Sequence, residues 1–139
     1  MTDTINFELV SPEAKLVSEP VKMAVMPGEE GEFGVSADHT SLVATLKPGV
    51  VELYTQGEAE PRKIFIAGGF ADVTGETCVV LAEEAVPVSD IDLEEITQTI
   101  KTLNEDLSIA KEEIDKARIE KRINMLEAKL TAVTGKLVA

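Results

Sequence analysis

Residues 89 to 134 contain neither glycine nor proline, and this absence constrains the fold more than any other feature of the 139-residue sequence. All six prolines, and every glycine except Gly135, precede that segment. Glycine and proline weaken helices and favour turns, so a long stretch without them that is rich in Glu, Lys, Ile, Leu and Ala predicts helix. The chain therefore divides into a turn-rich half, residues 1–88, and a helical half, residues 89–139.

The helical half carries apolar residues at the three- and four-residue spacing that places them on one helix face. They form two stripes: Ile96, Ile100, Leu103 and Leu107, then Ile119, Ile123, Leu126, Leu130 and Val133. Between the stripes, Ala110, Ile114 and Ala117 point to a different side. The helix must therefore break there or bury two faces.

We expect two antiparallel helices that turn within residues 107–111, because one helix over the whole segment would far exceed the average of about 11 to 12 residues. Ser108 is the candidate N-cap of the second helix, and Ser89, Asp90 or Asp92 that of the first. No helix breaker marks the turn, so a single extended helix stays an open alternative.

The turn-rich half consists of short apolar or alternating runs separated by glycine and proline, a pattern typical of a β-sandwich or barrel. The runs are INFELV, VKMAVMP, EFGVS, SLVATL, VVELYT, KIFIAGG, FADVT and TCVVLA. Cys78 lies in the last run, where we expect a buried thiol in a reducing compartment. No secretory signal and no run of 18 apolar residues is present, so we expect a cytosolic protein that spans no membrane.

The formal net charge of −13 argues against binding to nucleic acid or to an anionic membrane surface, both of which select basic proteins. Residues 1–88 carry 15 acids and 5 bases, residues 89–107 carry 6 and 1, and residues 108–139 carry 5 and 7. Only the last segment is net positive. We expect protein partners.

Catalytic motifs are missing from the sequence. It has no phosphate-binding G-x-x-x-x-G-K-[ST] loop, no G-x-G-x-x-G, no C-x-x-C, and one histidine, His39, whose neighbours suggest a turn. The acidic run at residues 28–32 lacks the spacing of a calcium loop. We therefore expect no catalytic residues, no metal site and no cofactor.

Three stretches carry a family resemblance: PGEEGEFGV (27–35), DHTSLVATLKPGVV (38–51) and IFIAGGFADVTGETCVVLAEEA (64–85). In order and spacing they closely resemble the epsilon subunits of bacterial F-type ATP synthases. Beyond residue 89 only length and helical character agree. The resemblance implies an α+β fold, with an N-terminal antiparallel β-sandwich of ten strands followed by a C-terminal two-helix antiparallel hairpin.

The resemblance also implies a function. Such a subunit is a non-catalytic part of the central stalk, and its sandwich binds the gamma subunit and the polar loops of the membrane-embedded c-ring. It couples rotation of the c-ring to gamma and to ATP synthesis. The implied location is the cytoplasmic face of the bacterial inner membrane, with membrane contact only through the complex.

Site residues follow from the same resemblance. The family's c-ring contact corresponds to Glu29, Glu30, Gly31 and Glu32, and its gamma contact to His39 and Leu42. The c-ring loops commonly present arginine or glutamine, which suit carboxylates. The family pattern G-H-A-P-L is replaced here by residues 38–42, DHTSL, which leaves the shape of that loop open.

The resemblance also implies that the hairpin regulates ATP hydrolysis. In braked family members an extended second helix faces acidic surfaces of the catalytic alpha and beta subunits and inhibits ATP hydrolysis. Candidate residues here are Lys116, Arg118, Lys121, Arg122 and Lys129.

The alternative is an ATP sensor, which in the family uses I-D-x-x-R-A on the first helix. Residues 91–96 read IDLEEI, with Glu95 in place of the arginine. A second near-match, IDKARI at 114–119, has Arg118 but lies on the other helix.

Overall fold

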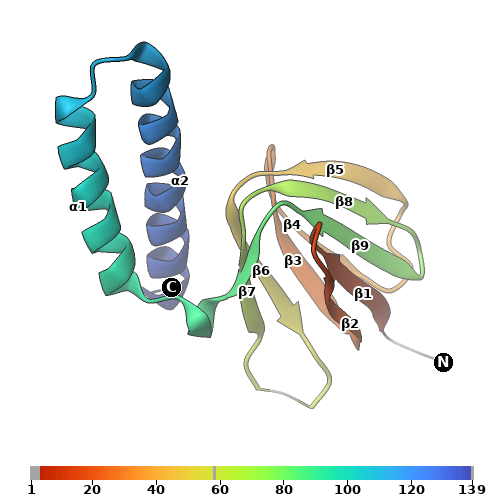
Figure 1. Cartoon of the computed structure of the whole chain (residues 1–139). Coiled ribbons are helices and arrows are strands. Elements are labelled where there is room, and N and C mark those ends of the chain that lie inside the picture. Colours follow the sequence, from red (N-terminus) through yellow and green to blue (C-terminus); the bar gives the residue numbers. More distant parts are fainter. Residues whose placement is uncertain (1–3, 58, 139) are drawn as a thin grey trace.

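A β-sandwich and a helical hairpin lie side by side in the computed structural model, which describes residues 4–57 and 59–138 (Figure 1). The strands are β1 (Ile5–Val10), β2 (Lys15–Val21), β3 (Met23–Gly28), β4 (Gly31–Ser36), β5 (Leu42–Leu46), β6 (Gly49–Tyr54), β7 (Arg62–Ile66), β8 (Gly69–Val73), β9 (Thr77–Ala82) and β10 (Ala85–Pro87). A 3₁₀ turn, η1 (Val88–Asp90), leads to α1 (Leu93–Ile109) and α2 (Glu113–Val138). The fold class expected from the sequence is confirmed.

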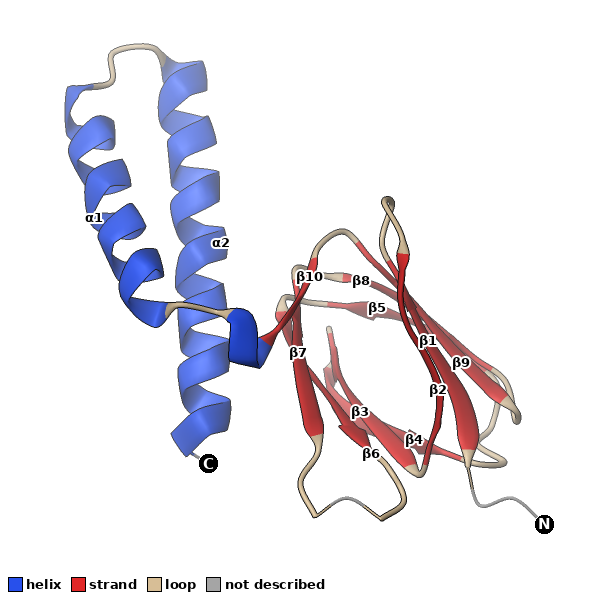
Figure 2. Ribbon diagram, turned by 60° about the horizontal axis from the view of Figure 1, so that its bottom comes forward, coloured by secondary structure: helices blue, strands red, loops and turns tan. Residues whose placement is uncertain are grey.

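The ten strands form one hydrogen-bonded sheet, in which nine follow the path β10-β7-β6-β3-β5-β8-β9-β1-β2 and β4 pairs with β3 beside it. The pairs are antiparallel apart from β1 and β9, which run parallel. Strands β3 and β5 are joined by a single residue pair, Gly28 with Leu46. The sheet folds over at this junction, so that its two halves face each other as the layers of a sandwich (Figure 2).

Side chains that alternate along the strands fill the space between the layers. In β1, Ile5, Phe7 and Leu9 are fully buried and the residues between them are not. Buried residues from the facing layer, such as Val51 and Leu53 of β6, belong to the same cluster. Because this cluster contains no helix residue, the sandwich has a hydrophobic core of its own.

Strands β2 and β10 were not among the eight runs expected from the alternating pattern. Both lie at the ends of the hydrogen-bonded path, and each contains a proline, Pro20 and Pro87. Proline lacks an N–H donor and is tolerated at sheet edges, where one side of the strand needs no partner. The prolines that obscured these strands in the sequence are thus compatible with their edge positions.

Asp92 begins the first helix as its N-cap. The carboxylate accepts hydrogen bonds from the backbone N–H groups of Glu94 at 3.0 Å and Glu95 at 3.1 Å. Both glutamates lie in the first turn, where the helix dipole favours negative charge.

The chain turns at residues 110–112, so the expectation of two helices is confirmed and the single extended helix is excluded. Ser108 is not the N-cap of α2, and that expectation was wrong. Its hydroxyl donates to the carbonyl of Glu105 at 2.6 Å, inside the last turn of α1. Serine can satisfy its own hydroxyl in this way within a helix, so its presence alone does not mark a helix start.

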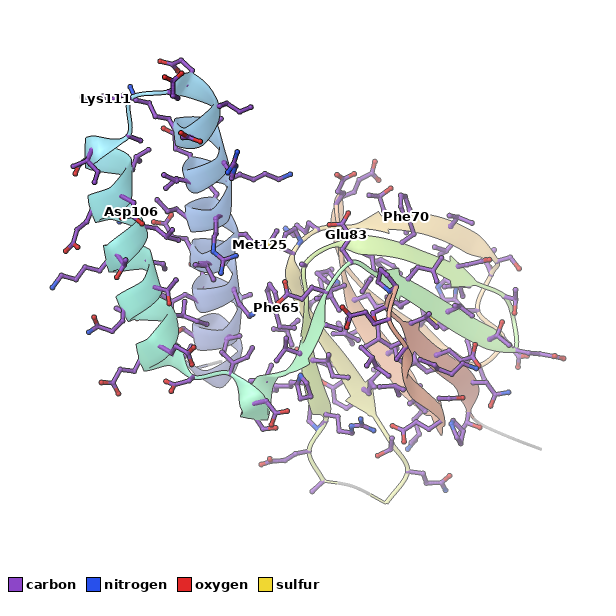
Figure 3. All side chains as sticks on the ribbon, viewed as in Figure 1. Phe65, Phe70, Glu83, Asp106, Lys111 and Met125 are labelled. Atoms are coloured by element: carbon purple, nitrogen blue, oxygen red, sulfur yellow. The ribbon has the colours of Figure 1, made fainter. Side chains whose placement is uncertain are left out.

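The hairpin packs on the outer face of β6 and β7 through α2. Along β7, Ile64 and Ile66 point into the sandwich core, and Phe65 points the other way. Phe65, Ala67 and Val133 form a second buried cluster, against which Met125 and Ala132 of α2 pack. Phe65 and Met125 are both labelled at this junction in Figure 3.

Candidate functional site

The acidic residues expected to form an interface lie on the β3–β4 hairpin. Gly28 pairs with Gly31, so Glu29 and Glu30 form its two-residue turn. Both side chains are exposed, and so is that of Glu32 in β4. Gly31 has φ of +137°, a backbone conformation that favours glycine. The turn therefore exposes two carboxylates at the tip of the β3–β4 hairpin.

The loop before β5 carries His39. Asp38 takes φ of +64°, the left-handed conformation that a glycine usually supplies and that aspartate tolerates. Two backbone hydrogen bonds hold the loop, from Asp38 N–H to Gly75 at 3.0 Å and from His39 N–H to Ser36 at 3.2 Å. Asp38, at the position of the glycine in the family pattern, thus takes a positive φ.

The half-buried ring of His39 is oriented by the loop itself. Its Nδ1 lies 2.7 Å from the carbonyl oxygen of Thr40. A carbonyl oxygen only accepts, so Nδ1 donates, and in the neutral ring Nε2 is left as an acceptor. Such a histidine presents one acceptor to a partner.

The structure brings the acidic turn and the His39 loop together. Both line one groove of about 540 Å³, between the β3–β4 hairpin and β5. Its walls include Glu29, Glu30 and Gly31 on one side and His39 and Leu42 on the other. Two sets of residues that the resemblance assigns to different partners therefore share a continuous surface.

An apolar row on the sheet continues from this groove and was missed by the sequence analysis. Thr45 pairs with Phe70, and Phe70 pairs with Leu81, so the three side chains lie on the same face. Val43 is 74% exposed, Phe70 54% and Leu81 52%. Val43 and Thr45 also line the groove. Figure 3 shows Phe70 on the outer surface, whereas Phe65 lies beneath the hairpin.

Leu42 contributes less to this surface than expected. It is half-buried and packs against the sandwich core, because alternation along β5 turns Leu42 inward and Val43 outward. The alternation of β5, β8 and β9 could have revealed the row from sequence, but it does not say which face of a sheet stays uncovered.

The five basic residues of α2 differ in their surroundings. Lys116 and Arg118 form ion pairs with Glu113 at 3.9 Å and Asp115 at 3.8 Å, both on the same helix. Lys121 and Arg122 are exposed. Lys129 is the exception, because it contacts Glu84 at 3.2 Å, outside the hairpin.

The segment aligned with the family's ATP-binding motif lines a small cavity of about 220 Å³ between α1 and α2. Asp90, Asp92 and Glu95 place three carboxylates there, opposite Arg122 and Lys129. Arg118, from the second near-match, does not line this cavity. The acidic lining is unfavourable for a polyphosphate.

Within the described residues, no group of three or more His, Cys, Asp or Glu side chains is placed to hold a metal ion. No helix among them is long and apolar enough to cross a membrane.

Cys78 is fully buried. Burial raises the pKa of its thiol to about 12, and the nearby carboxylate of Asp72 adds to the rise.

Two family models match the chain. The model for the β-sandwich domain of the ATP synthase delta/epsilon chain covers residues 4–88, and that for the C-terminal domain of the ATP synthase epsilon chain covers residues 92–139. The chain is 42% identical over 135 residues to the ATP synthase epsilon chain of Rhodospirillum rubrum, covering 97% of this chain and 100% of that one. It is 40% identical to that of Rhodospirillum centenum, with 97% and 95% covered.

Solved structures agree with these matches. A chain of the Euglena gracilis mitochondrial ATP synthase, in a complex described as OSCP/F1/c-ring, superposes with a TM-score of 0.79 at 27% identity, covering 96% of this chain and 83% of that one. A chain of the Tetrahymena thermophila mitochondrial ATP synthase central stalk and c-ring gives a TM-score of 0.57 at 12% identity, which shows a shared fold.

Proposed function

The chain belongs to the family of ATP synthase epsilon chains, which are non-catalytic subunits of that complex, and from this premise we propose that it couples rotation of the c-ring to the gamma subunit. The observation that carries the proposal is the continuous surface formed by the acidic turn, the His39 loop and the apolar row. A coupling subunit must bind the c-ring and gamma at the same time. This surface offers acidic side chains for one partner and apolar side chains for the other.

We assign the acidic turn to the c-ring. Glu29 and Glu30 are exposed on a short, well-defined turn, and Glu32 follows in β4. A carboxylate can form two charge-assisted hydrogen bonds with a guanidinium group, which resists sliding under torque. We expect basic or amide side chains in the facing loops of the ring.

We assign the His39 loop and the apolar row to gamma. Val43, Phe70 and Leu81 supply an apolar centre, and Nε2 of His39 supplies an acceptor at its border. Protein interfaces commonly combine an apolar centre with a polar rim. Leu42 supports the position of β5 from within.

The assignment implies a location at the cytoplasmic face of the bacterial inner membrane, with contact through the complex. The second proposed role is regulation: an extended α2 that faces acidic surfaces of alpha and beta would slow hydrolysis. The ATP-sensor alternative is disfavoured by the three carboxylates around the small cavity, one of which is Glu95 at the position of the family arginine.

Reversal of charge in the acidic turn tests the coupling role. We expect Glu29→Lys with Glu30→Lys to leave the sandwich folded and to weaken attachment to the ring by about tenfold or more, because like charges would meet. The measurement is ATP-driven proton pumping relative to ATP hydrolysis in complexes reconstituted in vesicles. The expected result is a lower ratio.

Glu105→Lys with Asp106→Lys is the matched control, because these two acids are also exposed and adjacent but lie on α1 (Asp106 is labelled in Figure 3). This variant should pump normally. If the turn variant also assembled and pumped like the control, the acidic turn would be a solvated surface and the assignment to the ring would be wrong.

A further inference from the structure

Lys129 is the basic residue of α2 that forms a described ion pair with the sandwich. Its ammonium lies 3.2 Å from Oε1 of Glu84 and 5.5 Å from the centre of the Phe65 ring. Its side chain is 14% exposed, compared with 40% for Lys116 and 75% for Arg118. Lys116 and Arg118 pair within α2, so those pairs do not depend on where the hairpin lies.

The remaining contact between α2 and the sandwich is mainly apolar. Val133 is buried against Phe65 and Ala67, and Met125 and Ala132 pack around them. Further along, α2 and the turn at residues 47–50 are separated by a cavity of about 550 Å³. There α2 presents small or polar side chains, namely Asn124, Ala128 and Thr131. Val50 of β6, which lines the same cavity, is 2% exposed, so apolar burial extends beyond the cluster at Phe65.

We propose that Lys129 holds the hairpin on the sandwich through its contacts with Glu84 and Phe65. When α2 leaves the sandwich, Lys129 loses both partners at once, whereas Lys116 and Arg118 keep theirs. The contact of Lys129 with Glu84 and Phe65 therefore stabilises the docked hairpin relative to the released one. It goes beyond the coupling role, since it needs neither gamma nor the ring.

The two interactions at Lys129 reinforce each other. The Lys129 side chain is largely shielded from water, and its ammonium lies over the Phe65 ring while it contacts the carboxylate of Glu84. Loss of both is expected to raise the ratio of released to docked hairpin by about three- to thirty-fold. The ion pair weakens with salt, so part of the effect should appear in wild type at high ionic strength.

The test measures docking in the full chain. Spin labels at Ser18→Cys in β2 and Thr102→Cys in α1, both exposed positions, report the distance between sandwich and hairpin by double electron–electron resonance. The native Cys78 is fully buried and should stay unlabelled. Wild type should give one main distance, and Lys129→Met should add a second population. Val133→Asp, which places a charge against Phe65, serves as the reference for a released hairpin.

Matched variants decide the outcome. Lys121→Met removes an exposed lysine from the same helix and should leave the distances unchanged. Lys129→Arg keeps the charge and the ring contact and should retain docking, and Glu84→Gln should release the hairpin less than Lys129→Met. The proposal is overturned if Lys129→Met matches wild type, or if Lys121→Met releases the hairpin equally. Far-UV circular dichroism and protection of Cys78 in unlabelled chains confirm that the sandwich remains folded.

Discussion

At the residue scale, the apolar row on β5, β8 and β9 gives the most direct test of the gamma contact. Phe70→Ser with Leu81→Ser should weaken binding of gamma by about tenfold or more, because aromatic and aliphatic centres carry much of an interface's binding energy. Stability should change little, since both side chains are more than half exposed. Calorimetric titration with gamma and thermal unfolding separate the two effects.

Leu16→Ser provides the control for that variant. Leu16 is another exposed aliphatic residue, at 47%, but it lies on the edge strand β2. It should leave gamma binding unchanged. Equal binding by the Phe70 and Leu81 variant and by the Leu16 variant would contradict the assignment of this face.

Sequence reasoning located the acidic turn and the His39 loop because both lie in short motifs whose order and spacing are specific. Sequence reasoning left the shape of the His39 loop open. In the structure Asp38 takes the left-handed conformation, which defines that shape. Phe70 was missed for a physical reason. Alternation tells which residues share a face, but exposure depends on how the sheet folds at the junction of β3 and β5.

At the element scale, turn residues and helical periodicity predicted most of the fold. The missed elements, β2 and β10, are edge strands with prolines, where neither alternation nor composition is typical of a strand. The end of α1 was also misplaced, because Ser108 bonds within the helix and no breaker marks residues 110–112. Val133 belongs to the predicted stripe but packs on Phe65, a long-range contact that periodicity cannot specify.

The strand layers should fold without the helices. A fragment ending at Val88 keeps the whole core cluster of the sandwich, which includes no residue of α1 or α2. It loses the cover over Phe65 and Ala67, so we expect cooperative unfolding at a midpoint lowered by several degrees, about 4 to 8 °C for each kcal/mol lost. Circular dichroism during heating gives the measurement. A disordered fragment would show that the helices complete the core.

At the scale of the whole molecule, the hairpin and the apolar row use different parts of the sandwich. The hairpin covers β6 and β7, whereas the apolar row crosses β5, β8 and β9 (Figures 1 and 2). The hairpin can therefore leave its docking site without uncovering the row. Variants in the apolar row should therefore leave docking of the hairpin intact, and release of the hairpin should leave the row exposed.

We expect substitutions of different basic residues on α2 to change ATP hydrolysis in opposite directions. If extended α2 slows hydrolysis through its exposed bases, alanine at Arg118, Lys121 and Arg122 should raise ATP hydrolysis by the assembled enzyme by about two- to tenfold, since each exposed pair contributes about 0 to 1 kcal/mol. Lys129→Met should instead lower hydrolysis, because it releases the hairpin from Glu84 and Phe65 and favours extension. ATP synthesis should change little in both variants.

A chain ending at Val88 lacks α2, so it cannot be inhibited by that helix and sets the upper limit of hydrolysis. Equal hydrolysis in all of these variants would show that α2 does not regulate the enzyme, and a rise with Lys129→Met would show that docking, rather than extension, is the inhibitory state.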